Sequence, residues 1–149
     1  MGTPDGTLDI SFSDWVGVQQ LIGRYVDAVD RHDPDALASC WAKSVVVDDS
    51  GQTVDRKVVV DSAIEIWKGR LPSERFRHFV TNVLLLSASP DTVKARVAIA
   101  WATATADGVR IDSHHAYTDE IVKEDGEWRF RRRQIGPYEL IVGAPETDK

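Results

Sequence analysis

The sequence is poor in cysteine and has no excess of basic residues. Cys40 is the only cysteine, so no disulfide can form within the chain. Lysine and arginine total 18 against 24 aspartate and glutamate, which gives a formal charge of −6 and a pI near 5.1. Because a protein that binds nucleic-acid phosphates needs a basic face, we expect no nucleic-acid partner.

Long apolar runs are also missing. No run approaches the ~18 apolar residues that a membrane-spanning helix requires. The first residues, MGTPDGTLD, contain neither the basic segment nor the apolar segment of a secretion signal. The net negative charge disfavours an anionic lipid surface as well. We therefore expect no membrane association and a cytoplasmic location.

Patterns typical of metal and cofactor sites are absent too. The four histidines do not form a ligand pattern, since His114 and His115 are adjacent on a predicted strand and their side chains diverge. The sequence has no glycine-rich phosphate loop and no CxxC pair. We predict neither a metal nor a cofactor, and we interpret Cys40 as a small core residue.

What the sequence does contain is enough apolar material for one ordinary domain. Hydrophobic residues make up 42% of the 149 residues, which is typical of a folded chain. The first half is helical in pattern. Ser11 to Asp14 resembles a capping sequence, and Asp33-Pro34 favours the start of a second helix. We predict helices at about 14–31, 34–42 and 56–70, a short strand at 44–48 and a turn at Asp49-Ser50-Gly51. The apolar positions that recur at helical spacing are Trp15, Val18, Ile22, Val26 and Val29 in the first helix and Val59, Ala63, Ile66 and Trp67 in the third.

The second half alternates with a period of two, which indicates strands. We predict strands at 75–86, 92–105, 109–123 and 127–135, joined by turns at 89–91, 106–108 and 124–126. The whole chain is thus predicted to be one α+β domain, with loose tails at 1–10 and 144–149. A curved sheet packed on helices encloses a pocket. Val93, Val97 and Ile99 are expected on an outer sheet face that the helices cannot cover, which favours a homo-oligomer.

Asp30 is the first candidate site residue. It shares a helix stripe with Ile22 and Val26, so its side chain should face the core near the negative end of the helix. Burial and the helix dipole both disfavour a charged carboxylate there unless a partner offsets them. The alternative is that Asp30 reaches solvent or a nearby backbone group, because the following residues indicate that the helix is ending.

His78 is the second candidate. Strict alternation places it on one mostly apolar strand face with Val80, Asn82, Leu84 and Leu86. A histidine there is either a satisfied core residue or a general base, and a base needs a second group to orient its ring. The requirements are complementary, since Asp30 needs a donor and His78 needs an acceptor.

Three stretches resemble the SnoaL-like domains of the NTF2-like superfamily. They are Arg24 to Asp33 on the first helix, Arg77 to Asn82 on the first long strand, and Asp125 to Phe130 before the last. The resemblance covers about residues 12–140. It implies a cone in which three N-terminal helices pack on a strongly curved, mainly antiparallel sheet. The superfamily includes scytalone dehydratase, lindane dehydrochlorinase, bile-acid 7α-dehydratase, polyketide cyclases, ketosteroid isomerase and the small subunits of ring-hydroxylating dioxygenases.

The resemblance also implies roles for particular residues. His78 would be the general base and Asp30 its orienter, and Tyr25, a pocket tyrosine, is counted with them as catalytic. Trp41, as an aromatic residue on the second helix, and Arg133 are assigned to substrate binding. Arg133 matches a position that helps to hold the leaving halide in the dehydrochlorinase. The run Arg131 to Arg133 leaves open the alternative of solvated arginines on an outer strand.

The chain departs from some dehydratases where they carry a second acid. The matching stretch here is Ala100-Trp101-Ala102, which has no titratable group. We assign Trp101 to substrate binding. Ser113, His115 and Tyr117 share one face of the next strand and could replace the missing acid, so Ser113 and His115 are also assigned to the substrate site. We give His114 and His32 no role.

These observations favour a cofactor-independent lyase or isomerase, similar to a dehydratase, that uses an Asp–His dyad to remove a proton. The expected partner is a small hydrophobic substrate of polycyclic, steroid or polyketide type. The homo-oligomer would be a trimer or a dimer by resemblance. Two alternatives remain, a non-catalytic binding or accessory domain and a structural partner similar to a dioxygenase small subunit.

Overall fold

The computed structural model describes residues 8–47, 50–71 and 73–137. Within them the chain forms three helices and six strands. The helices are α1 (Phe12–Arg31), α2 (Pro34–Cys40) and α3 (Arg56–Lys68); the strands are β1 (Trp41–Val46), β2 (Thr53–Asp55), β3 (Arg75–Ala88), β4 (Thr92–Thr105), β5 (Gly108–Glu124) and β6 (Glu127–Pro137). Residues 1–7 and 144–149 of the expected tails, together with Asp48 and Asp49, lie outside the described residues.

The two helix caps predicted from the sequence are confirmed, although α1 begins at Phe12 rather than at about 14. Ser11 caps α1, and its Oγ accepts a hydrogen bond from the backbone N–H of Asp14 at 3.1 Å. Asp33 caps α2 through the N–H of Ala36 at 2.9 Å, with Pro34 at the first helical position. Between these caps, His32 ends α1 in the left-handed region with φ of 55°.

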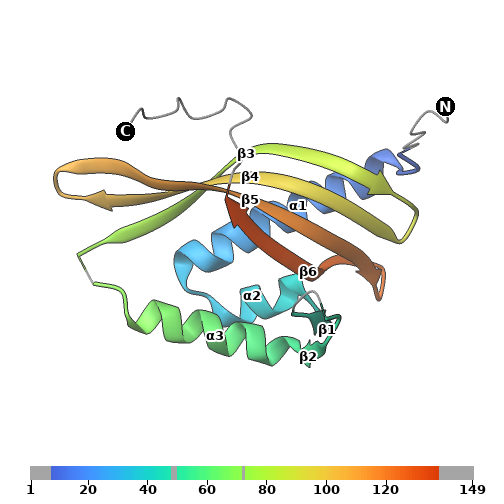
Figure 1. Ribbon diagram of the computed structural model, residues 1–149, viewed down its shortest axis with the longest axis horizontal. Coiled ribbons are helices and arrows are strands. Elements are labelled where there is room, and N and C mark those ends of the chain that lie inside the picture. The colour runs from blue at the N-terminus through green and yellow to red at the C-terminus, as the bar shows by residue number, and fades with distance from the viewer. Residues whose placement is uncertain (1–7, 48–49, 72, 138–149) are drawn as a thin grey trace, which may run out of the picture.

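The strands form one sheet in the order β2-β1-β6-β5-β4-β3. The pairing of β1 with β6 is parallel, and every other pairing is antiparallel. Figure 1 shows long curved strands, with α1 crossing behind them and α2 and α3 gathered on one side. The predicted α+β class and the arrangement of three helices on a mainly antiparallel sheet are therefore confirmed.

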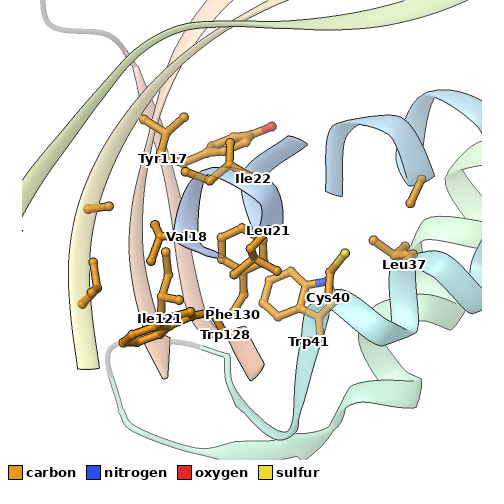
Figure 2. Packing of buried hydrophobic residues seen from close by; sticks show 14 of the residues in the cluster. Val18, Leu21, Ile22, Leu37, Cys40, Trp41, Tyr117, Ile121, Trp128 and Phe130 are labelled. Atoms are coloured by element: carbon orange, nitrogen blue, oxygen red, sulfur yellow. The ribbon is translucent and has the colours of Figure 1, made fainter. Parts of the chain in front are cut away.

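The core lies between the helices and one face of this sheet. Leu21 and Ile22 of α1 fill the space between Tyr117 and Ile121 of β5 on one side and Leu37 of α2 on the other (Figure 2). Burying side chains of this size stabilises the fold by about 1.5–3 kcal/mol each. Cys40 is fully buried in the same cluster, as predicted.

Two bulges interrupt the alternation of β3. The register with β4 shifts between Val80 and Asn82 and again between Leu85 and Ser87. An extra residue moves the following side chains to the other face. The core-facing residues after His78 are therefore Val83 and Leu85, whereas Leu84 is 56% exposed. The expectation that His78 shares a face with Asn82, Leu84 and Leu86 is wrong for this reason.

The residues expected on the outer sheet face also differ. Val93, Val97 and Ile99 are at most 1% exposed and belong to the core, because their face of β4 is the one that the helices cover. The uncovered face instead carries Phe79 and Leu84, which are 47% and 56% exposed. The expectation that the valines and Ile99 lie outside is thus wrong.

Several boundaries shift as well. Helix α2 ends at Cys40, so Trp41 begins strand β1 rather than closing the helix. Ile66 is 60% exposed instead of buried, and Val60 is the buried residue of α3.

Strand β2 was not expected from the sequence. Part of the expected loose arm is ordered, since Leu8 forms a parallel bridge with Ala88.

Candidate active site

A cavity of about 280 Å³ lies between the helices and the inner face of the sheet. Its wall is largely aromatic and aliphatic. Helix α1 contributes Tyr25 and Val29, and α3 with the residues after it contributes Val59, Ala63, Ile66, Trp67 and Arg70. Leu37 of α2 and strand residues complete the wall, namely Trp41, His78, Trp101, Tyr117 and Ile135. Of the predicted site residues, the structure thus brings Tyr25, Trp41, His78 and Trp101 to one cavity.

Asp30 and His78 form a hydrogen-bonded pair at the edge of this cavity. His78 Nδ1 lies 2.6 Å from Asp30 Oδ1, and the backbone N–H of His78 donates to Asp30 Oδ2 at 3.1 Å. The side chains of His78 and Asp30 are only 11% and 10% exposed. The alternative that Asp30 turns to solvent is therefore excluded. Because Nδ1 contacts the carboxylate, Nε2 is the ring nitrogen of His78 that is left to contact a molecule in the cavity.

The end of α1 positions the carboxylate. The backbone N–H of His32 donates to the carbonyls of Ala28 and Val29, and that of Asp33 donates to Ala28 at 2.9 Å. These bonds close the helix directly after Asp30, so Asp30 stands in the last turn. The imidazole of His32 also stacks on Trp67 of α3, with ring centroids 4.9 Å apart and planes at 11°. That stack joins the end of α1 to α3, and burial lowers the pKa of His32.

Trp101 and Tyr117 lie next to the pair on the inner face of the sheet. The His78 and Trp101 rings meet edge to face at 5.8 Å. The indole N–H of Trp101 donates to the hydroxyl of Tyr117 at 3.3 Å. Burial raises the pKa of Tyr117 to about 12, so the phenol keeps its proton at neutral pH and can donate it toward the cavity.

Arg133 does not line the cavity but lies behind its wall. It forms a two-point ion pair with Asp119, at 2.7 Å for both Nε and Nη2, and the two side chains are 4% and 0% exposed. Burial lowers the pKa of Arg133, but the Asp119 charge and hydrogen bonds outweigh it and raise the pKa overall. The guanidinium also lies 4.2 Å from the ring of Tyr25 and 4.1 Å from that of Tyr117. The interpretation of Arg133 as a solvated arginine is therefore wrong.

Ser113 and His115 face inward but stand outside the cavity lining. His115 Nε2 lies 2.9 Å from Ser113 Oγ, and the His115 ring packs on Trp101 at 4.4 Å. The two residues thus contact or neighbour Trp101 of the wall, while neither is among the residues that line the cavity. Their assigned contact with substrate has no geometric support in this arrangement.

Sequence reasoning assigned no site role to Trp67 or Arg70 and treated Tyr117 only as a substitute acid. Tyr117 shares the alternation of Ser113 and His115 and could have been selected with them. Trp67 follows Ala63 by four residues, a spacing that places both on one helix face. Arg70 carries no pattern signal, because it follows the end of α3.

Within residues 8–47, 50–71 and 73–137, no cluster of three or more histidine, cysteine or acidic side chains could hold a metal ion. None of the helices in those ranges is long and apolar enough to cross a bilayer.

Solved structures with the same fold include several bacterial proteins. Rv3472 of Mycobacterium tuberculosis, a protein of unknown function, is 24% identical; the alignment covers 89% of this chain and 81% of that one with a TM-score of 0.72. Aln2 of a Streptomyces species is 21% identical over 90% and 97% of the two chains, with a TM-score of 0.74.

A third is the beta subunit of a protein described as an aromatic-ring-hydroxylating dioxygenase from Novosphingobium aromaticivorans. It is 16% identical over 81% of this chain and 86% of that one, with a TM-score of 0.62. At such identities the similarity shows the fold alone.

No functionally curated protein matches the sequence. The family model of the SnoaL-like domain matches residues 11–134, which include both members of the Asp30–His78 pair and all the cavity-lining residues except Ile135. With that match over most of its length, the chain belongs to the SnoaL-like domain family.

Proposed function

We propose that this protein is a cofactor-independent lyase or isomerase in which His78 removes a carbon-bound proton from a small hydrophobic substrate. The observation that carries the proposal is the contact between His78 Nδ1 and Asp30 Oδ1 at 2.6 Å, on the wall of an apolar cavity. A base must be held in one tautomer and face the proton that it removes. The Asp30 contact supports the first condition, and the place of His78 on the cavity wall supports the second.

In this mechanism Asp30 keeps the proton of His78 on Nδ1, which leaves the lone pair of Nε2 directed at the substrate. As Nε2 takes the proton, the imidazole becomes a cation, and the Asp30 carboxylate stabilises that charge. General base catalysis of this kind contributes ~10²–10⁴-fold in rate. The electron pair left on carbon then expels a leaving group, shifts a double bond or closes a ring.

The hydroxyls of Tyr25 and Tyr117 are the proposed hydrogen-bond donors to a substrate oxygen that gains negative charge during the reaction. Both tyrosines line the cavity, where a phenolic O–H can donate a hydrogen bond to a substrate oxygen. A fixed donor at a developing oxyanion is worth roughly 10²–10³-fold in rate. Arg133 lies against both rings, so its role is to position the two tyrosines rather than to touch the substrate.

The test uses 2-tetralone, an apolar bicyclic ketone with an acidic C–H group. Wild-type protein in deuterated water should accelerate exchange of the α-protons, followed by NMR. His78→Ala and Asp30→Asn should lose this acceleration while keeping the circular dichroism spectrum and melting temperature of a folded chain. His115→Ala is the matched control, because His115 stands outside the cavity lining and should exchange as wild type.

Exchange that persists in His78→Ala would refute the catalytic proposal. A protein that binds 2-tetralone without accelerating exchange would support the binding-domain alternative instead. The likeness to a dioxygenase beta subunit keeps the structural-partner alternative in view. That alternative predicts a stable complex with a larger subunit and no effect of the His78 and Asp30 substitutions on it.

A further inference from the structure

Arg70 stands where the apolar cavity meets a second, more polar one. It follows the end of α3 and lines the cavity that holds His78. It also lines an adjoining cavity of about 320 Å³, to which Asp30 and Trp67 contribute. Arg70 and Trp67 therefore form the boundary between the two spaces. A molecule that reaches His78 from the polar side would pass this arginine.

The guanidinium is held over the ring of Phe76. Its central carbon lies 3.4 Å from the ring centroid, which is a close cation–π contact. Phe76 precedes His78 by two residues on β3, and the register with β4 is regular between them. Both side chains therefore share a face of the strand. The contact fixes the Arg70 charge on the same side of the sheet as the proposed base.

The charge of Arg70 is poorly compensated where it stands. Among the described residues that line the His78 cavity, Arg70 is the one permanently charged side chain, and none of them is a carboxylate. The described residues give it no ion pair within 4.0 Å. Burial lowers the pKa of Arg70, while the charges of Glu74 and Asp30 raise it. An arginine at the border of an apolar cavity, whose neighbouring carboxylates Asp30 and Glu74 form no ion pair with it, is suited to bind an anion from solution.

We propose that Arg70 recognises a carboxylate on the substrate, so that the preferred substrates are apolar ring compounds that carry a carboxylate group. This inference rests on the proposed function and names its substrate class. The ring system would occupy the aromatic cavity among Tyr25, Trp41 and Trp101. The planar guanidinium matches a carboxylate in two-point geometry, which a neutral ketone or ester cannot reproduce. The reacting carbon then lies between the anchored carboxylate and His78.

The test compares two probes of similar shape, 2-naphthoate and the neutral ketone 2-acetonaphthone. Binding is followed by isothermal titration and by quenching of tryptophan fluorescence. We expect wild type to prefer the carboxylate by roughly 10- to 100-fold, as for a charge-assisted hydrogen bond. Arg70→Gln should lose this preference and keep its affinity for the ketone, and Arg70→Lys should restore part of it.

Arg77→Gln is the matched control. Arg77 lines the more polar cavity but not the one that holds His78, and its Nη1 donates to the carbonyl of Phe76. The preference for 2-naphthoate should survive Arg77→Gln. This variant removes the same charge as Arg70→Gln, so it shows whether the loss of one positive charge is enough to abolish the preference. Equal loss in both variants would overturn the proposal, as would equal affinity of wild type for the two probes. A merely structural role for Arg70 would lower the melting temperature and weaken both probes together, which would also overturn it.

The result separates this inference from the proposed function. Deuterium exchange that depends on His78, combined with no preference for 2-naphthoate, would refute the carboxylate site and leave the base in place. Preference for 2-naphthoate that depends on Arg70, without any exchange, would refute the catalytic proposal and leave a carboxylate-binding cavity.

Discussion

A single carboxylate, that of Asp30, holds His78 at two points. Oδ1 contacts the ring nitrogen Nδ1 at 2.6 Å, and Oδ2 accepts the backbone N–H of the same residue at 3.1 Å. The ring and the strand that carries it are thus fixed by one side chain from α1. Both oxygens are needed as acceptors, which makes an amide a poor replacement for this carboxylate.

Asp30→Asn should therefore change the tautomer of His78. The amide has one acceptor oxygen, and its NH₂ group can donate to Nδ1, which would move the ring proton to Nε2 and remove the lone pair from the cavity. We expect nitrogen NMR of the imidazole to show Nδ1–H in wild type and Nε2–H in Asp30→Asn. The resonance is assigned by its loss in His78→Ala. An identical tautomer in both proteins would contradict the orienting role of Asp30.

The buried pair of Asp119 and Arg133 should be essential for stability. Asp119→Asn leaves the guanidinium without its counter-charge in a site that is 4% exposed, so we expect a loss of about 3–5 kcal/mol in the free energy of unfolding. Asp61→Asn is the control, because its pair with Lys57 is 53% and 76% exposed and should contribute at most about 1 kcal/mol. Urea denaturation measures both, and similar losses in the two variants would count against this account.

Gly17 should resist substitution while Gly23 accepts it. A Cβ at Gly17 would lie 2.7 Å from Cδ1 of Trp128, whereas at Gly23 it would meet nothing within 4 Å. The ring of Trp128 is anchored by a hydrogen bond to Asp14. We expect Gly17→Ala to cost about 1–3 kcal/mol through overpacking, and Gly23→Ala to gain up to about 1 kcal/mol in helix propensity. Thermal and urea unfolding would test this, and a neutral Gly17→Ala would show that Trp128 can move.

Tyr117 should ionise at a higher pH than a free tyrosine. Its pKa is raised from 10.0 to about 12 by burial, so the folded state binds this proton more tightly than the unfolded state does. The resulting stability is complete below pH 10 and is lost as pH rises toward 12. We expect the unfolding free energy of wild type to fall relative to that of Tyr117→Phe across this range. The phenolate absorbance that wild type shows and Tyr117→Phe lacks isolates the titration of Tyr117, and a midpoint near pH 10 in this difference would contradict the raised pKa.

Self-association remains a prediction, now assigned to different residues. Phe79 and Leu84 lie on the uncovered sheet face, so Leu84→Lys should shift a dimer or trimer toward monomer. Lys94 is also exposed on the sheet, so Lys94→Glu serves as the control for the effect of a changed surface charge. Light scattering after size exclusion measures the mass, and a wild-type monomer at high concentration would refute the expectation.

Most of the fold could be predicted because its signals are local. The caps at Ser11 and Asp33 and the turns at 106–108 and 124–126 each depend on neighbouring residues, and all are present in the structure. The bulge after Val80 has no such signal, because an extra residue in a strand is decided by pairing with β4. The side chains that directly follow it on β3 were therefore placed on the wrong face.

The residues of the candidate site likewise fall into those that could be predicted from the sequence and those that could not. Asp30 and His78 could be paired from sequence, because a buried acid and a buried imidazole each require a partner of the other kind. Arg133 could not be placed, since its partner Asp119 and its ring contacts lie on other elements. Trp41 moved from the helix to β1 because a residue at a junction of two elements is decided by the sheet it joins.

The parallel pairing of β1 with β6 constrains the order in which the molecule can assemble. Trp41 of β1 is held in register with Phe130 of β6, so during synthesis β1 cannot complete this pairing until β6 has been made. Contacts so distant in sequence form slowly. A ribosome-bound chain that stops before β6 would therefore expose the aromatic wall of the future cavity to solvent, and chaperones that bind exposed apolar surface should engage this protein before β6 is made.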